Sequence, residues 1–232
     1  MLKVKNSKEM PITESSDLHV EELRKILLSI LSSIQAEAYI DSYSTGLNKK
    51  QIRESLVSNW NIMDFEEAKS VIDWLITGGQ NMLFEEIKHV FVKSLESSRA
   101  MTEFRKLTRN FDYQHKFYKY YENVHIFQAN YPELSFSQKD FEKGIKAWDL
   151  SRGVFVARMC YDIHYLDKIQ FENILNMAQN QARATYTSWD EYFKGYLLGR
   201  IMYSYDTGVK SQLELLGELK YNPQSPINEI SW

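Results

Sequence analysis

The feature that most constrains the fold of this chain is a long interval without proline. The 232 residues contain four prolines, and none of them lies between Pro11 and Pro132. Proline breaks helix interiors and punctuates turns, so this interval predicts long helices. Glycine is also scarce, at 9 residues, which excludes collagen-like and low-complexity chains.

Apolar residues recur at helical spacing along most of the chain, and no strand-like alternation is present. In the second half, typical N-capping residues stand at Ser137, Asp167 and Ser188, with partners at Asp140 and Glu191. The patterns predict an all-α, compact domain of about eight to ten helices. In the first half we expect helices near 17–34, 48–60, 64–77, 82–97 and 99–129, with one break near 110–112.

The ends of the chain differ in character from this helical body. Residues 1–17 are polar and include Pro11, so we expect a flexible N-terminal lead-in. Residues 18–232 are predicted to form a single all-helical domain, and the loop at 130–136 is the candidate for a sub-boundary. The short tail is expected to dock its terminal Trp232 on the helices.

Bulk properties limit the classes of function. The formal charge of −3 gives no global reason to expect nucleic acid or an anionic membrane. No apolar stretch suits a transmembrane helix or a secretory signal, and the single Cys160 fits a reducing compartment. We therefore expect a cytoplasmic protein with no membrane partner. No nucleotide-binding glycine motif or nucleophile motif is present, and no cofactor is predicted.

Several motifs in the second half have spacings that composition does not explain. They are AWDLSR at 147–152, SWDEYF at 188–193, YLLGR at 196–200, and Ser225-Pro226 with the terminal Trp232. Together they resemble the bacterial domain-of-unknown-function family 1266, over about 47–232 and with the family-like core at 147–232. The resemblance implies a bacterial, cytoplasmic, helical domain and supplies no chemistry. Ala147 and His164 stand where the family often has glycine, and Ile227 replaces a tryptophan of the tail motif.

The first candidate site is a charged set on these motifs. Asp149 with Arg152, Arg158 with Asp162, and Tyr196 with Arg200 are spaced to share helix faces. Arginines so placed can clamp a carboxylate or phosphate, which predicts a binding site for an anionic ligand or nucleotide. The alternative is an internal ion-pair network that fixes the helix register. Four further residues are interpreted as structural anchors: Trp148, Trp189, Gly199 and Trp232.

A second candidate is a metal site. Glu86 with His89 and Glu122 with His125 are both Glu-x-x-His pairs, the motif that holds metals in ferritin-like bundles. Solvated surface pairs are the default interpretation of these four residues.

Residues 88–119 carry eight basic and three acidic side chains, interleaved with aromatic residues that fall at inward helical spacings. This stretch fits a protein or acidic-peptide partner at least as well as single-stranded nucleic acid.

Three hypotheses about function remain open. The first is a non-enzymatic protein-interaction domain of the adaptor or toxin-neutralising type. The second is an enzyme or binding protein for a small anionic ligand that uses the Asp/Arg set. The third is a Glu/His di-metal protein. The sequence favours the first and identifies neither a partner nor an oligomeric state.

Overall fold

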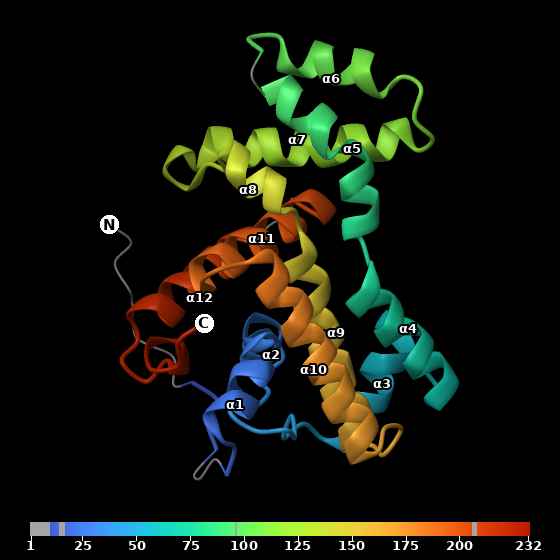
Figure 1. Ribbon diagram of the computed structural model, residues 1–232, viewed down its shortest axis with the longest axis vertical. Helices are drawn as coiled ribbons and strands as arrows, with labels where there is room; N and C mark the ends of the chain where they lie inside the picture. The colour runs from blue at the N-terminus through green and yellow to red at the C-terminus, as the bar shows by residue number, and fades with distance from the viewer. Residues whose placement is uncertain (1–9, 14–16, 96, 206–207) are drawn as a thin grey trace.

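The computed structural model describes residues 10–13, 17–95, 97–205 and 208–232, and these residues form helices and no strand. The all-α fold class is confirmed. Helices α6 and α7 lie at one end of the long axis, while α1 and α3 lie at the other (Figure 1). The helices are α1 (Val20–Leu27), α2 (Ile30–Gln35), α3 (Lys49–Trp60), α4 (Phe65–Thr77), α5 (Asn81–Leu95), α6 (Ala100–Thr108), α7 (Gln114–Asn130), α8 (Gln138–Lys143), α9 (Lys146–Asp162), α10 (Lys168–Thr185), α11 (Trp189–Tyr203) and α12 (Gly208–Tyr221). Two short 3-10 turns, Pro132–Leu134 and Pro226–Asn228, complete the described elements.

Local capping explains where several helices begin. Asn48 Oδ1 accepts from the Lys50 amide at 2.8 Å at the start of α3. Ser137 and Asp167 form the reciprocal capping boxes of α8 and α10. Ser188 caps α11 as predicted, but the Glu191 carboxylate binds the backbone amide of Thr187 rather than that of Ser188. The predicted capping box of α11 is therefore half correct.

Helix α9 is the centre of the larger part of the fold. Only its first residue and a few others along its length keep partial exposure, and it packs against α4, α10 and α11. Small residues permit this close packing. Gly153 faces Ile76 of α4, and Gly199 of α11 faces Trp148, where an added Cβ would lie 2.5 Å from the tryptophan Cβ.

The buried apolar side chains form two clusters that meet along α11. The first cluster is formed by helices α1 through α4, by α9 and α10, by the start of α11 and by the end of α12. The second cluster is formed by helices α5 through α8, by the end of α11 and by the start of α12. Tyr196 belongs to the first cluster and the next residue, Leu197, to the second, so one helix contributes to both cores. The loop at 130–136 is mostly exposed, but its Phe136 is buried in the second cluster.

The first helical segment differs from the prediction. A single helix was expected, but α1 ends at Leu27 and α2 begins at Ile30. Ser29 separates them, and its hydroxyl donates to the Ile26 carbonyl at 2.8 Å. Ser and Thr hydroxyls compete with helix backbone in this way, which favours a break.

The two ends of the described chain are anchored. Most of the expected lead-in, residues 1–9 and 14–16, lies outside the described residues, but Thr13 N donates to Asp41 at 2.9 Å. At the other end Trp232 Nε1 donates to the Tyr186 carbonyl at 2.9 Å, and its ring meets Trp189 edge-on. The predicted docking of Trp232 is confirmed. No helix within the described ranges is long and apolar enough to cross a membrane.

Candidate functional site

The Asp149–Arg152 pair lies at the junction of α9 with α5. The Asp149 carboxylate is fully buried and forms an ion pair with Arg152. It also accepts from the Asn81 amide at 2.8 Å, and so caps α5 from another helix. Burial raises the pKa of Asp149, while Arg152 and the amides of Asn81 and Gln80 favour its charged form.

Arg152 itself is held by its neighbours. Its guanidinium lies 4.5 Å from the centroid of the Trp148 ring and 5.7 Å from that of Trp60. Its Nε donates to the Trp148 carbonyl at 3.2 Å. These contacts fix α3 against α9, so the charge of Arg152 is engaged within the protein.

The Arg158–Asp162 pair lies between two and three turns further along α9 and contacts a different segment. Arg158 is fully buried, and its guanidinium donates to the carbonyls of Tyr39, Ser42 and Ser44 at 2.6 to 2.9 Å. It also donates to Ser33 Oγ at 2.7 Å, and Asp162 accepts from the Thr45 amide at 2.8 Å. Burial lowers the pKa of Arg158 to about 10, so it stays charged at neutral pH. Together the two residues fold the segment 39–45 onto α9.

Tyr196 and Arg200 on α11 do not join these groups into one site. The Tyr196 hydroxyl lies 3.3 Å from Gln35 Oε1, and its ring meets Trp148 edge-on. Arg200 Nη1 donates to the Ser204 carbonyl at 2.6 Å. The six sequence-predicted residues thus divide into the Asp149–Arg152 pair, the Arg158–Asp162 pair and the two residues of α11, and each is bonded to residues of this chain.

The four predicted anchors lie in or against the cores. Trp148 and Trp189 are 9 % and 8 % exposed, and Trp189 Nε1 donates to the Ile230 carbonyl at 2.8 Å. Gly199 accommodates the Trp148 side chain, and Trp232 packs on Tyr192 and Trp189. These contacts account for the residue types without a ligand.

The Glu-x-x-His motifs do not converge. The described part of the chain contains no group of three or more His, Cys, Asp or Glu side chains that could hold a metal. Glu86, His89 and His125 are exposed, while Glu122 is half-buried on α7. Cys160 is buried, and burial raises the pKa of its thiol to about 12, which leaves it protonated at neutral pH.

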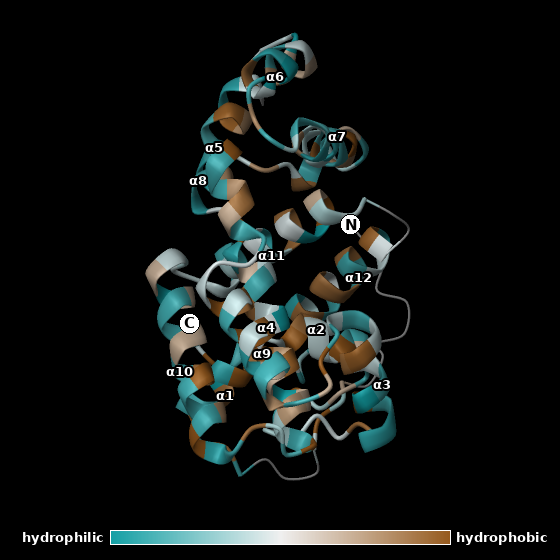
Figure 2. Cartoon of the chain, turned by 90° about the vertical axis from the view of Figure 1, so that its right-hand side faces the viewer, coloured by the Kyte–Doolittle hydropathy of each residue, from teal (hydrophilic) through white to brown (hydrophobic). Residues whose placement is uncertain are grey.

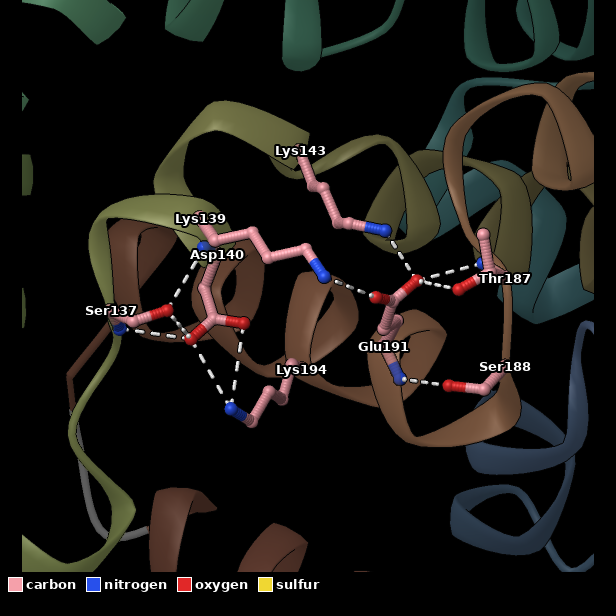
Figure 3. A network of polar contacts seen from close by, with 8 residues as sticks. All are labelled: Ser137, Lys139, Asp140, Lys143, Thr187, Ser188, Glu191 and Lys194. Carbon is pink, nitrogen blue, oxygen red and sulfur yellow. Dashed lines mark hydrogen bonds and ion pairs between the residues drawn. The ribbon is translucent and has the colours of Figure 1, made fainter.

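A charged network between α8 and α11 has no counterpart in the sequence-derived predictions. Figure 3 shows Glu191 between Lys143 and Lys139 of α8 and Thr187, which precedes α11. Burial by itself would raise the pKa of Glu191, but the hydrogen bonds from Lys143 and Thr187 outweigh it and lower the pKa to about 2. Lys194 binds Asp140 at 3.2 Å in a second link (Figure 3). The partners are about 50 residues apart, so no local spacing reveals them.

The α6–α7 hairpin, residues 99–130, carries exposed cations. Figure 2 shows hydrophilic residues on both helices, which lie at the end of the molecule. Arg99, Arg109 and Lys119 are exposed, and no ion pair joins them to a carboxylate of the described chain. The aromatic residues between them behave differently: Phe104, Phe117 and Tyr121 are fully buried. These three rings are therefore not available on the surface, whereas the three cations are.

Two apolar side chains stand among these cations. Leu107 on α6 is 39 % exposed, and Tyr113, between the two helices, is 62 % exposed. Tyr113 also has a φ of +62°, a left-handed conformation that costs a non-glycine residue free energy. Tyrosine and arginine are residue types enriched at the energetic centres of protein interfaces.

The protein is an all-α protein, and the motif residues in the second half of its sequence hold its helices against one another. The sequence model of the family described as "Protein of unknown function (DUF1266)" matches residues 55–232. This chain belongs to that family, as the resemblance predicted. No curated protein and no solved structure matches the chain.

Proposed function

We propose that this chain is a non-catalytic protein-interaction domain of the bacterial cytoplasm, and that the α6–α7 hairpin binds an acidic surface of its partner. The observation that carries the proposal is the set of exposed cations Arg99, Arg109 and Lys119, which form no ion pair with a carboxylate of the described residues. Unpaired surface charges of one sign steer a partner of opposite sign and select against like-charged surfaces.

A protein partner is favoured over nucleic acid by the placement of the aromatic side chains. Proteins that grip single strands stack successive bases on exposed aromatic rings. In this hairpin Phe104, Phe117 and Tyr121 are enclosed in the second core, where Phe104 and Tyr121 stack at 4.4 Å between ring centroids. Leu107 and Tyr113 instead offer the apolar anchors that protein interfaces use.

The Asp/Arg motif residues support the same proposal. Asp149 caps α5 and Arg158 folds the segment 39–45, so each serves the scaffold that presents the hairpin. The buried thiol of Cys160 suits a reducing compartment.

Affinity capture from native cells followed by hydrogen–deuterium exchange tests the proposal. The expected result is one stoichiometric protein whose addition slows amide exchange in residues 99–119. Protection confined to other helices, or a co-purifying small molecule with no protein, would contradict it.

A further inference from the structure

A polar cavity of about 500 Å³ lies away from the α6–α7 hairpin, where the ends of four helices meet. Its walls come from the start of α5, the end of α8, the first residue of α9 and the end of α10. Cavities of this volume hold metabolite-sized ligands. The lining includes no large apolar side chain, so a lipid or another apolar ligand does not suit it.

Three lysines of the described chain line the cavity, at positions 139, 143 and 146, but only two acids do. Lys139 and Lys143, on successive turns of α8, share the single carboxylate of Glu191 (Figure 3). Of the two lining acids, Glu85 is already paired with Lys88 at 2.5 Å. Glu142 accepts from the neutral amide of Gln138 at 2.8 Å.

Lys146 is the lining lysine that remains available to bind an anionic ligand. Its ammonium donates to Gln181 Oε1 at 2.6 Å, and no carboxylate of the described residues forms an ion pair with it. It is the first residue of α9, and Asn81, also in the lining, is the first residue of α5. The N-terminus of α9 adds partial positive charge to this wall, whereas the N-terminus of α5 is already capped by Asp149. The Asn81 side chain adds a neutral amide donor, while the Thr185 hydroxyl donates to the Gln181 carbonyl at 3.1 Å within α10.

The α8 wall is held in place by the network already described. Lys143 is only 17 % exposed, and its bond to Glu191 fixes the end of α8 against the start of α11. Asn81 Oδ1 accepts from the Ile145 amide at 3.0 Å, which orients the side chain between α5 and α9. The cavity is therefore formed before any ligand arrives, which lowers the entropic cost of binding.

We propose that this cavity binds a small anionic metabolite and that the carboxylate or phosphate of the ligand lies against Lys146. The inference is independent of the protein-interaction role, because the hairpin contributes no residue to the cavity. Carboxylate and phosphate share the chemistry that recognises them here, namely charge-assisted hydrogen bonds from ammonium and amide donors.

Calorimetric titration of the purified full chain with succinate, glutamate and inorganic phosphate tests the site. We expect saturable binding of at least one probe at a stoichiometry of one, and competition between probes identifies the preferred anion. Lys146→Met should weaken binding at least tenfold. Lys168→Met, at the opposite end of α10, should leave it unchanged.

A second variant keeps the test valid if Lys146→Met fails to fold. Ala184 is exposed in the cavity wall on α10, so Ala184→Phe should preserve the helix and fill the entrance. It should also abolish binding while the thermal unfolding curve stays unchanged. The proposal is overturned if none of the probes binds the wild-type chain, or if the probe binds Ala184→Phe as tightly as wild type.

Discussion

Gly79 lies directly against the carboxylate of Asp149: a Cβ added at Gly79 would stand 2.2 Å from Asp149 Cγ. The glycine has a φ of +58°, so it both ends α4 and makes room for the acid that caps α5. One residue pair therefore sets the turn between two helices and their position on α9.

Gly79→Ala should be strongly destabilising because it combines a left-handed φ with a clash against a buried charge. We expect the free energy of unfolding to fall by about 2–4 kcal/mol in urea denaturation. Gly217→Ala is the control, since nothing lies within 4 Å of a Cβ added there in α12. It should be neutral or slightly stabilising. Equal losses for the two variants would show that the Gly79–Asp149 contact has no special role.

Arg158→Lys keeps the charge and removes the forked donor set, in which Nη2 binds three carbonyls, Nη1 binds the Ser33 hydroxyl and Nε binds the Tyr43 carbonyl. The free energy of unfolding should fall by about 2–4 kcal/mol, because a single ammonium group cannot reach all of these acceptors. Limited proteolysis should show faster cleavage in the segment 39–45. Arg183→Lys, at a side chain that is 45 % exposed, should change stability by less than about 0.5 kcal/mol. An Arg158→Lys protein as stable as wild type would refute the assigned role.

The Glu191 network predicts a definite dependence of stability on pH. The folded pKa is about 2, against 4.5 for the free side chain, so the contribution is present above pH 4.5. It is lost as the pH falls toward 2 and the carboxylate becomes protonated. Glu191→Gln should lower the free energy of unfolding by about 1–2 kcal/mol at pH 7 and by much less at pH 2. Glu86→Gln, at an exposed position on α5, should follow the wild-type curve. A gap between Glu191→Gln and wild type that is constant with pH would argue against this network.

His164 follows α9 in a strained backbone conformation. Its φ of +64° is the left-handed conformation that glycine adopts without strain. His164→Gly should therefore stabilise the chain by about 0.5–1 kcal/mol in thermal unfolding. His115→Gly, within helix α7, should destabilise it by a similar amount. A loss of stability at His164→Gly would mean that its side-chain contacts outweigh the backbone strain.

Local signals in the sequence predicted much of this fold, because helix caps and breaks depend on neighbouring residues. The caps at Ser137 and Asp167 and the break between α6 and α7 follow from such signals. The division at Ser29 and the cap that Asp149 supplies to α5 were not predicted. Asp149 lies 68 residues from Asn81, whose amide it caps. Arg158 donates to the hydroxyl of Ser29, at the break between α1 and α2, from 129 residues away.

The candidate sites could also be predicted only in part from the sequence. The motif spacings indicated which residues matter, and the choice between an internal network and a ligand site depended on tertiary contacts. Only the structure shows that Arg158 is surrounded by carbonyls and that the Glu-x-x-His motifs do not converge. It also shows that Lys143 and Lys139 meet at Glu191 and border a cavity.

The most direct test of the proposed interaction compares two triple charge reversals in the capture experiment. The hairpin variant is Arg99→Glu with Arg109→Glu and Lys119→Glu. The control reverses the exposed cations Lys50, Lys69 and Lys168, so both variants change the formal charge by six units from −3. We predict that the control recovers the partner as wild type does, while the hairpin variant loses it at least tenfold. Equal recovery by the two variants would contradict the claim that the α6–α7 hairpin is the docking surface.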